Sequence, residues 1–421
     1  MNKVKVALIG AGLRGDNYLN YALDYPDELE VVAVAEPVER RREQFQRKHG
    51  LSDEQCFAHW DELFASEKLA DAVLICTQDK QHFEPTAKAL AAGYHVLLEK
   101  PMSPDATECV AMGDMALRYD RVFAICHVLR YTPFFGTIKA LLEQGEIGNL
   151  ISITHNENVG YWHQAHSFVR GNWRRKEESS PMILAKSCHD LDILQWLVDS
   201  ACTRVSSFGA LTHFRADQAP HGAPARCLDG CPVADDCLYY APDLYLTDDT
   251  EWPTSAISDD PSLEARTEAL KNGPYGRCVY HCDNDVVDHQ VVNLQFANDV
   301  TVAFTMSAFT RDVSRTIKLM GTKGEIRGAM EKNEIEVLRF GSGHARRISL
   351  DHLGGHVGHG GGDNRLMTDF LQLVREGGGK EGLTSANRSV QSHLIAFAAE
   401  QSRVTGEVVE MDRFREGLAT G

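Results

Sequence analysis

The stretch Val4-Lys5-Val6-Ala7-Leu8-Ile9-Gly10-Ala11-Gly12-Leu13-Arg14-Gly15 decides the fold of this chain. Its first six residues are nearly all apolar, which is typical of a strand buried on both faces. Gly10, Gly12 and Gly15 then follow the pattern G-x-G-x-x-G, and a helical pattern runs on to about Asp24. A strand, a glycine-rich turn and a helix in this order predict a dinucleotide-binding βαβ unit.

Four more apolar strands follow, with helical segments between and after them. They are predicted at residues 30–36, 72–76, 95–98 and 122–125. Continuous apolar strands that alternate with helices indicate a parallel sheet covered on both faces. We therefore expect an α/β fold whose N-terminal Rossmann domain spans residues 1–130.

The pattern changes after about Gly148, where strands begin to alternate between apolar and polar residues, as half-buried antiparallel strands do. Examples are residues 151–154, 291–296, 302–306 and 316–320, and helices near 365–375 and 386–402 close the chain. Residues 131–421 are thus predicted to form a C-terminal α+β domain with an open, largely antiparallel sheet. This would be the substrate and oligomerisation domain.

The stretch at about 217–285 interrupts this domain, is rich in Pro, Gly, Asp and Cys, and shows little periodicity. We interpret it as an insertion without a core of its own. Thiolates of Cys227, Cys231, Cys237 and Cys282, with Cys278 as the alternative ligand, are candidates for a structural zinc site that would tie it down. The spacings C-x3-C and C-x5-C also leave open free cysteines and, as a lesser option, an iron–sulfur cluster.

The overall charge restricts the partners. A formal net charge of −17 over 421 residues argues against nucleic acid and against anionic membranes, because phosphate binding needs a basic surface. No stretch approaches a membrane span of about 18 apolar residues, and the N-terminus lacks a signal-peptide pattern. A cytoplasmic location with reduced cysteines follows as an expectation.

The glycine-rich turn has a specific physical rationale. Gly10 permits a tight turn, Gly12 lets the backbone approach a pyrophosphate, and Gly15 lets the helix pack on the strand. Glu36, about 20 residues further on, would accept hydrogen bonds from ribose hydroxyls and repel a 2′-phosphate, which favours NAD over NADP. Against this, Arg40 and Arg41 could turn toward such a phosphate, or simply form a solvated helix face.

Leu97-Leu98-Glu99-Lys100-Pro101 ends the fourth predicted strand. An E-K-P there, after G-x-G-x-x-G, resembles the Gfo/Idh/MocA family of oxidoreductases, whose namesakes are glucose-fructose oxidoreductase and inositol dehydrogenase. Cys76-Thr77 with His82, His127 to Tyr131, Trp173-Arg174 and His189 to Asp192 also resemble family segments. The resemblance spans nearly the whole chain except the insertion. It implies a homodimer or homotetramer formed through the open sheet.

The resemblance also implies which residues contact NAD. These are Gly10, Gly12, Leu13, Arg14, Gly15, Glu36, Cys76, Thr77, His82, Glu99, Lys100, Pro101, Arg130, Trp173 and Arg174.

The implied reaction is oxidation of a secondary alcohol of a sugar, polyol or related compound, or its reverse. Such a step needs a group that takes or gives the hydroxyl proton. Lys100, at the carboxyl end of a strand, could position the hydroxyl or, with a lowered pKa, take the proton. His189 falls on the family's acid/base position. Many members carry an Asp four residues before it; here Ala185 stands there, beside Lys186, which could share that work with Lys100.

Candidate substrate contacts lie mostly in a run dense in aromatic and hydrogen-bonding groups. They are Lys100, Tyr131, Tyr161, His166, Arg170, Trp173, Lys186, His189 and His359, with His356 and residues 359–363 as a candidate rim loop. Arg170, Arg174 and Lys186 together could accept an anionic substituent.

Three functions fit these residues, with a small-molecule carbohydrate as the substrate of the first two. The first is an NAD-dependent sugar or polyol dehydrogenase. The second is a redox-neutral, NAD-dependent glycoside hydrolase that oxidises the sugar transiently and eliminates the substituent, with an anionic glycoside as one option. The third, a non-catalytic NAD-binding regulator, fits less well because Lys100 and His189 are both present.

Overall fold

The computed structural model describes residues 2–353, 358–378 and 381–420. Its N-terminal part is a parallel sheet with strand order β3-β2-β1-β4-β5-β6, the doubly wound arrangement of dinucleotide-binding domains. The strands are β1 (Val4–Ile9), β2 (Leu29–Ala35), β3 (Cys56–Phe57), β4 (Ala72–Ile75), β5 (His95–Leu98) and β6 (Phe123–Ile125). All five strands predicted from the sequence are confirmed; only the two-residue edge strand β3 was missed.

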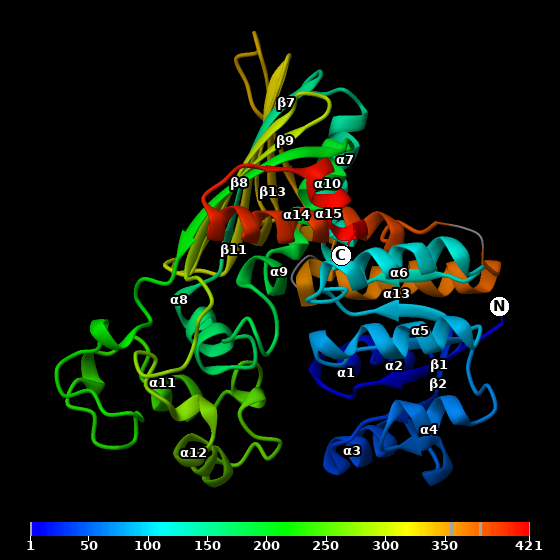
Figure 1. Cartoon of the computed structure of the whole chain (residues 1–421), viewed down its shortest axis with the longest axis vertical. Coiled ribbons are helices and arrows are strands. Elements are labelled where there is room, and N and C mark those ends of the chain that lie inside the picture. Colours follow the sequence, from blue (N-terminus) through cyan, green and yellow to red (C-terminus); the bar gives the residue numbers. More distant parts are fainter. Residues whose placement is uncertain (1, 354–357, 379–380, 421) are drawn as a thin grey trace.

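Helices cover this sheet on both sides (Figure 1). They are α1 (Leu13–Leu19), α2 (Tyr21–Asp24), α3 (Glu39–His49), α4 (Trp60–Ala65), α5 (Phe83–Ala91) and α6 (Ala106–Arg118). A seventh, α13 (Gly358–Glu376), comes from near the end of the chain and packs Leu366, Phe370 and Leu371 into the same core cluster as β1. The chain therefore returns to its N-terminal part after β14 and before β15, the last strand of the second sheet.

The second sheet has nine strands in the order β14-β13-β12-β11-β7-β10-β9-β8-β15, antiparallel throughout except for the β7–β10 pair. These strands are β7 (Leu150–Asn158), β8 (Cys202–Ala210), β9 (His289–Phe296), β10 (Thr301–Ser307), β11 (Ser314–Gly321), β12 (Gly324–Ala329), β13 (Glu334–Arg339), β14 (Arg346–Ser349) and β15 (Val409–Glu410). Burial alternates residue by residue along β10 and β11, so one face of the sheet is packed, as the apolar–polar alternation predicts.

Helices pack against the buried face of this sheet. They are α7 (Pro133–Glu143), α9 (Met182–Ala185), α10 (Cys188–Val198), α14 (Ala386–Thr405) and α15 (Met411–Thr420), and α10 and α14 lie beside the strands in Figure 1. No helix in the described ranges is long and apolar enough to cross a bilayer.

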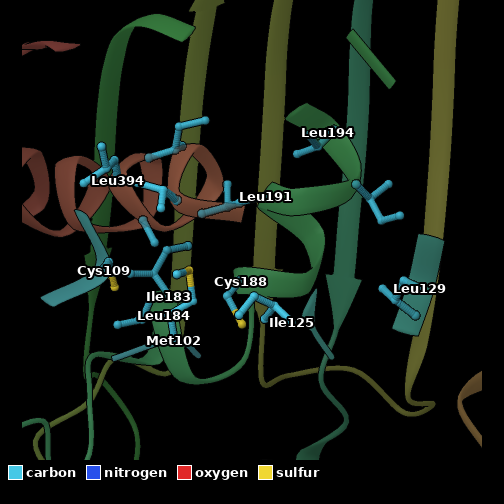
Figure 2. Close-up of a cluster of buried hydrophobic side chains, with 14 of the residues drawn as sticks. Met102, Cys109, Ile125, Leu129, Ile183, Leu184, Cys188, Leu191, Leu194 and Leu394 are labelled. Carbon is cyan, nitrogen blue, oxygen red and sulfur yellow. The ribbon is translucent and has the colours of Figure 1, made fainter. Parts of the chain in front are cut away.

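One hydrophobic core joins the two halves of the molecule. Figure 2 shows side chains from both halves meeting beside α10: Met102, Cys109, Ile125, Leu129, Ile183, Leu184, Cys188, Leu191, Leu194 and Leu394. This core anchors α9 and α10, and the last residue of α9, Ala185, accepts a hydrogen bond from Lys100 beyond the end of β5.

The insertion is a compact lobe that contains α11 (Ala241–Tyr245) and α12 (Leu263–Asn272). It has a small apolar cluster of Cys227, Ala241, Tyr245 and Leu270, so the prediction that it lacks a core is wrong. Buried Arg266 also donates hydrogen bonds to the carbonyls of Tyr245 (2.8 Å) and Thr247 (2.9 Å), which ties α12 to the loop after α11.

Candidate active site

The glycine-rich turn connects β1 to α1. Gly10 has φ +89°, and a Cβ on it would lie 2.6 Å from the carbonyl oxygen of Cys76. A Cβ on Gly15 would lie 2.4 Å from the carbonyl oxygen of Gly10, whereas the space around Gly12 is open. The turn is therefore closed against the protein at Gly10 and Gly15 and open at Gly12, the shape that close approach of a pyrophosphate needs.

Glu36 lies beside this turn at the end of β2. Its buried carboxylate accepts hydrogen bonds from the backbone N–H groups of Ala11 (2.8 Å) and Val38 (2.9 Å). Each carboxylate oxygen can accept more than one hydrogen bond, so Glu36 keeps acceptor capacity for ribose hydroxyls. These residues fit an NAD ribose, and the carboxylate is fixed in place before any nucleotide binds.

Arg40 and Arg41 are engaged by the insertion. Nη2 of Arg40 donates to the backbone oxygen of Asp259 (3.0 Å), and Nε of Arg41 lies 3.5 Å from the Asp259 carboxylate. The insertion thus contacts α3 of the Rossmann part. Arg40 and Arg41 are therefore neither free to bind a phosphate nor simply exposed to solvent. No local pattern in the sequence indicated that their partner would be Asp259.

Arg14 and Glu99, both predicted NAD contacts, form an ion pair. Nε of Arg14 lies 2.9 Å from Oε1 of Glu99, and Nη2 lies 2.8 Å from Asp363 on α13. Burial alone would raise the pKa of Glu99, but Arg14 and Lys100 outweigh it and hold that pKa below its usual value. Tyr18 donates to the same carboxylate (3.1 Å). The cluster fixes α1 and α13 to the end of β5.

Lys100 lies two residues after the end of β5. Its backbone N–H donates to the Glu99 carboxylate (2.6 Å), and its Nζ donates to the carbonyl of Ala185 (3.2 Å). His82 fastens the neighbouring loops, with Nδ1 2.7 Å from the Pro101 oxygen and Nε2 3.2 Å from the Thr77 oxygen. The ammonium group is thereby aimed at the junction of α9 and α10, which carries Lys186 and His189.

His189 lies in the first turn of α10 and is 7% exposed. Its ring stands edge-on to that of His127, 5.9 Å away. Burial lowers the pKa of His127 to about 3, so this neighbour is neutral near pH 7. The end of β5 and the start of α10 thus bring Lys100 and His189 to the same region, as the predicted site requires.

Arg130 is paired with a buried aspartate. It is buried and makes two 2.7 Å hydrogen bonds to Asp192, and its Nη1 donates to the carbonyl of Leu383 (2.9 Å). Burial opposes the charge on Asp192, but Arg130 keeps its pKa below the usual value. A buried aspartate requires this guanidinium, so the structure gives no support to the prediction that Arg130 contacts NAD.

A chain of buried charges lies beneath Lys186. Its Nζ is 3.1 Å from Glu157 on β7, and Arg315 on β11 is 2.7 Å from the same carboxylate. Arg315 also contacts Asp190 (2.9 Å), which accepts from His155 (2.8 Å). The sequence reasoning missed Glu157 and Arg315. Polar residues at the inward positions of an alternating strand, such as 155 and 157, were the available signal.

Several predicted substrate contacts are committed to other partners. Tyr131 donates to Asp369 (2.7 Å) on α13, and His166 is 2.8 Å from the Tyr245 hydroxyl in the insertion. Burial lowers the pKa of His166 to about 3. These side chains stabilise packing between segments, so their assignment to the substrate is not supported.

The predicted anion-binding group of Arg170, Arg174 and Lys186 does not assemble. Arg170 is fully buried and donates to the carbonyls of Arg277 and Tyr239, both at 2.7 Å. Arg174 pairs with Asp283 (2.8 Å) and Lys186 with Glu157. Each of the three cations therefore has its own structural partner. The three side chains do not form a shared anion-binding group, so they no longer support an anionic substrate.

Two of the predicted aromatic substrate contacts, Trp173 and Tyr161, pack against other rings. Trp173 is half-buried against the core, with its ring 6.2 Å from that of Phe168, and Tyr161 lies 6.1 Å from Tyr239. His356 lies outside the described residues, and of His359 only the backbone, in the first turn of α13, is described.

The predicted zinc site is not supported. Within residues 2–353, 358–378 and 381–420, no group of three or more His, Cys, Asp or Glu side chains is arranged to hold a metal ion. Cys227, Cys231, Cys237 and Cys278 line one small cavity, while the Cys282 thiol instead donates to the carbonyl of Cys278 (3.3 Å). Apolar packing and arginine-to-carbonyl hydrogen bonds hold the insertion together.

The sequence matches two family descriptions. Residues 4–127 match the oxidoreductase family with an NAD-binding Rossmann fold, and residues 139–411 match the C-terminal alpha/beta domain of that family. The chain therefore belongs to the Gfo/Idh/MocA family of oxidoreductases and has the NAD-binding Rossmann domain of that family, as the E-K-P and glycine motifs indicated.

Particular relatives share moderate identity with this chain. YteT of Bacillus subtilis (strain 168), whose name places it among oxidoreductases, is 24% identical over 333 residues, 74% of each chain. Inositol 2-dehydrogenase of Corynebacterium glutamicum (strain R) is 23% identical over 48% of this chain, which spans 56% of that relative. A levoglucosan dehydrogenase solved with NADH and L-sorbose has the same fold, with a TM-score of 0.72, 20% identity and coverage of 98% and 99%.

Proposed function

We propose that this oxidoreductase is an NAD-dependent dehydrogenase that acts on a secondary alcohol of a sugar, a polyol or a sugar derivative. The observation that carries the proposal is the position of Lys100. Its ammonium group projects from the carboxyl end of β5, the edge where open α/β sheets bind ligands, toward the segment with Lys186 and His189. The named relatives that act on inositol and levoglucosan support the substrate class.

The proposed roles follow from the chemistry of these side chains. Bound NAD supplies the hydride acceptor. Lys100 orients the substrate hydroxyl and stabilises the negative charge that develops on its oxygen. His189 takes the proton, and Lys186, fixed by Glu157 at 3.1 Å, contributes positive charge beside the position where many family members have an Asp.

Three further features are part of the proposal. We place the boundary between the NAD-binding and substrate domains at residue 130, and we expect a cytoplasmic homodimer or homotetramer. One face of strands β7, β9 and β10 is exposed and carries Thr154, Asn293 and Ala303. This exposed face supports association of subunits through the second sheet. Light scattering on the purified protein tests this, and a monomer at micromolar concentration contradicts it.

Preference for NAD over NADP should depend on Asp259 as well as on Glu36. Asp259→Asn removes the carboxylate beside Arg41, so that guanidinium becomes available to a 2′-phosphate. We expect the Kd for NADP to fall about two- to five-fold, the range of an exposed ion pair, while the Kd for NAD changes little. Fluorescence titration with the reduced nucleotides measures both constants.

Asp248→Asn is the matched control, since Asp248 is an exposed carboxylate of the same insertion. If Asp259→Asn and Asp248→Asn have the same NADP affinity as the unchanged protein, Asp259 has no part in nucleotide selection.

The first experiment measures NADH absorbance for the protein with NAD and a panel of sugars, polyols and glycosides, with product analysis on the same samples. NADH that accumulates with one substrate supports the dehydrogenase. NAD-dependent release of an aglycone without net NADH would instead identify the redox-neutral glycoside hydrolase. Neither product with any compound would contradict both.

A further inference from the structure

A cavity of about 330 Å³ lies between the substrate domain and the insertion, outside the region of Lys100 and His189. One wall carries Tyr161 and Trp162 of the short helix α8 (Tyr161–His163) and Arg170 of the π-helix Gln164–Arg170 that follows it. The insertion supplies the other wall, including Tyr240 and Asp243. The cavity therefore exists only because the insertion folds against the substrate domain.

The lining combines aromatic rings with charged hydrogen-bonding groups. Tyr161, Trp162 and Tyr240 are partly buried and line the cavity, with the Trp162 ring stacked on that of His163 (ring centroids 5.6 Å apart), and Asp235 and Asp243 are exposed. The C–H faces of a sugar ring pack on aromatic faces, and its hydroxyl groups donate to carboxylates. This mixture of apolar surface and few polar groups is the usual character of a small-molecule site.

Arg170 gives independent evidence for a ligand. The side chain is fully buried and lines the cavity; Nε and Nη2 donate to backbone carbonyls, the guanidinium interacts with the Tyr245 hydroxyl, and Nη1 makes no hydrogen bond of good geometry within the described part of the chain. Buried donors in proteins are almost always satisfied. A hydroxyl oxygen of a bound sugar would supply the missing acceptor.

The cavity adjoins the proposed active site through α8. His163, the neighbour of Trp162, is partly buried, and its pKa is lowered first by loss of solvent around the ring and then by the charges of Lys186, His166 and Arg315. Helix α8 also begins four residues after Glu157 of β7, which lies 3.1 Å from Lys186, so one short segment joins the cavity wall to the charged groups around Lys186. A ligand long enough to reach past α8 would contact both places.

We propose that this cavity is a second saccharide subsite, which binds a neutral sugar ring linked to the ring that is oxidised. The inference rests on the proposed function, because it describes the remote part of the same substrate. Asp235, Asp236 and Asp243 surround a single arginine at this cavity, so they disfavour an anionic sugar. The substrate would then be an oligosaccharide or a glycoside of a neutral sugar.

Tryptophan fluorescence of the full chain tests the subsite, because Trp162 lies in the cavity. The probes are cellotriose, maltotriose and xylotriose, compared with glucose and xylose. We expect a saturable change with at least one trisaccharide, with a Kd at least about ten-fold lower than that of its monosaccharide. Tyr240→Ala should raise that Kd about 3- to 10-fold through loss of ring stacking.

Asp243→Asn keeps the shape of the side chain and should raise the Kd about three-fold through loss of a charged acceptor. Phe340→Ala, which removes an exposed ring far along the chain, is the control and should leave the Kd unchanged. NADH formation from a monosaccharide substrate should stay the same in all three variants.

Absence of saturable binding for all three trisaccharides would overturn the subsite, as would equal trisaccharide affinity in Tyr240→Ala, Asp243→Asn and the unchanged protein. Displacement by choline rather than by trisaccharides would identify a cation site instead. If a trisaccharide binds as expected but no sugar yields NADH, the subsite stands and the proposed dehydrogenase activity fails.

Discussion

Lys100→Met should lower kcat/KM for the sugar substrate by about 10²- to 10⁴-fold, the contribution of one positioned acid/base or electrostatic group. Methionine has a similar length and fills similar space, but it neither orients a hydroxyl nor stabilises negative charge on its oxygen. Most of the loss should appear in kcat, since these interactions strengthen as charge develops. Steady-state NADH formation at saturating NAD measures it.

NAD affinity provides the internal control for this variant. Nζ of Lys100 is directed to the carbonyl of Ala185. The Kd for NADH should therefore change by less than about three-fold. Lys271→Met, on the exposed surface of α12, should retain full activity. If Lys100→Met keeps activity within a few-fold of the unchanged enzyme, Lys100 has no catalytic role and the proposed mechanism fails.

Arg315→Met should reduce the free energy of unfolding by about 3–5 kcal/mol, because it removes the guanidinium that two buried carboxylates share and leaves Glu157 with Lys186 alone and Asp190 with His155 alone. Glu157 and Asp190 are fully buried and lie 2.7 and 2.9 Å from Arg315. Burial acts to raise the pKa of Asp190, but Arg315 and His155 together outweigh it and hold that pKa well below its usual range. Urea denaturation near pH 7 measures the loss.

The pH dependence of stability gives a second readout of the same substitution. A depressed carboxyl pKa stabilises the fold at pH values above the unfolded pKa of about 3.9, and the stabilisation is lost as the pH falls below it. In Arg315→Met this acid-dependent part should shrink. Arg327→Met on β12 is the control: it is half-exposed and should cost less than about 0.5 kcal/mol. Equal stability loss in both variants would contradict a special role for the buried network.

The fold could be predicted in most respects because its signals are local. Residues 4–15 show strand, glycine turn and helix within one short segment, and burial on both faces makes each central strand an apolar run. The alternation in β10 and β11 likewise follows from packing on one face. The prediction missed β3, which has two residues, named no strand for β8 or for β12 to β15, and did not place α13 on the Rossmann part, since no local pattern states which surface a helix will cover.

The candidate site was predicted unevenly for the same reason. Lys100 and His189 follow recognisable motifs, and the structure brings their elements together. Arg130, Tyr131, His166, Arg170 and Arg174 also stood near motifs, yet their partners are Asp192, Asp369, Tyr245, backbone carbonyls and Asp283. A polar residue in a sequence does not show whether a buried group elsewhere already requires it.

The cysteines illustrate the difference most directly. Their spacing in the insertion suggested zinc, but ligation requires four sulfur atoms at fixed distances around one point, and spacing does not set those distances.

By itself, the sequence determined the α/β Rossmann part, the half-buried second sheet, the position of Glu36 beside the glycine turn and the family with its NAD-binding domain. These follow from periodicity and from motifs whose members lie within a few residues of each other. Only the tertiary structure decided that Glu157 and Arg315 support Lys186, that Asp259 engages Arg40 and Arg41, and that the insertion closes a cavity over Trp162. Each of these contacts joins residues far apart in the chain, and their partners are chosen by the packing of whole elements rather than by local sequence.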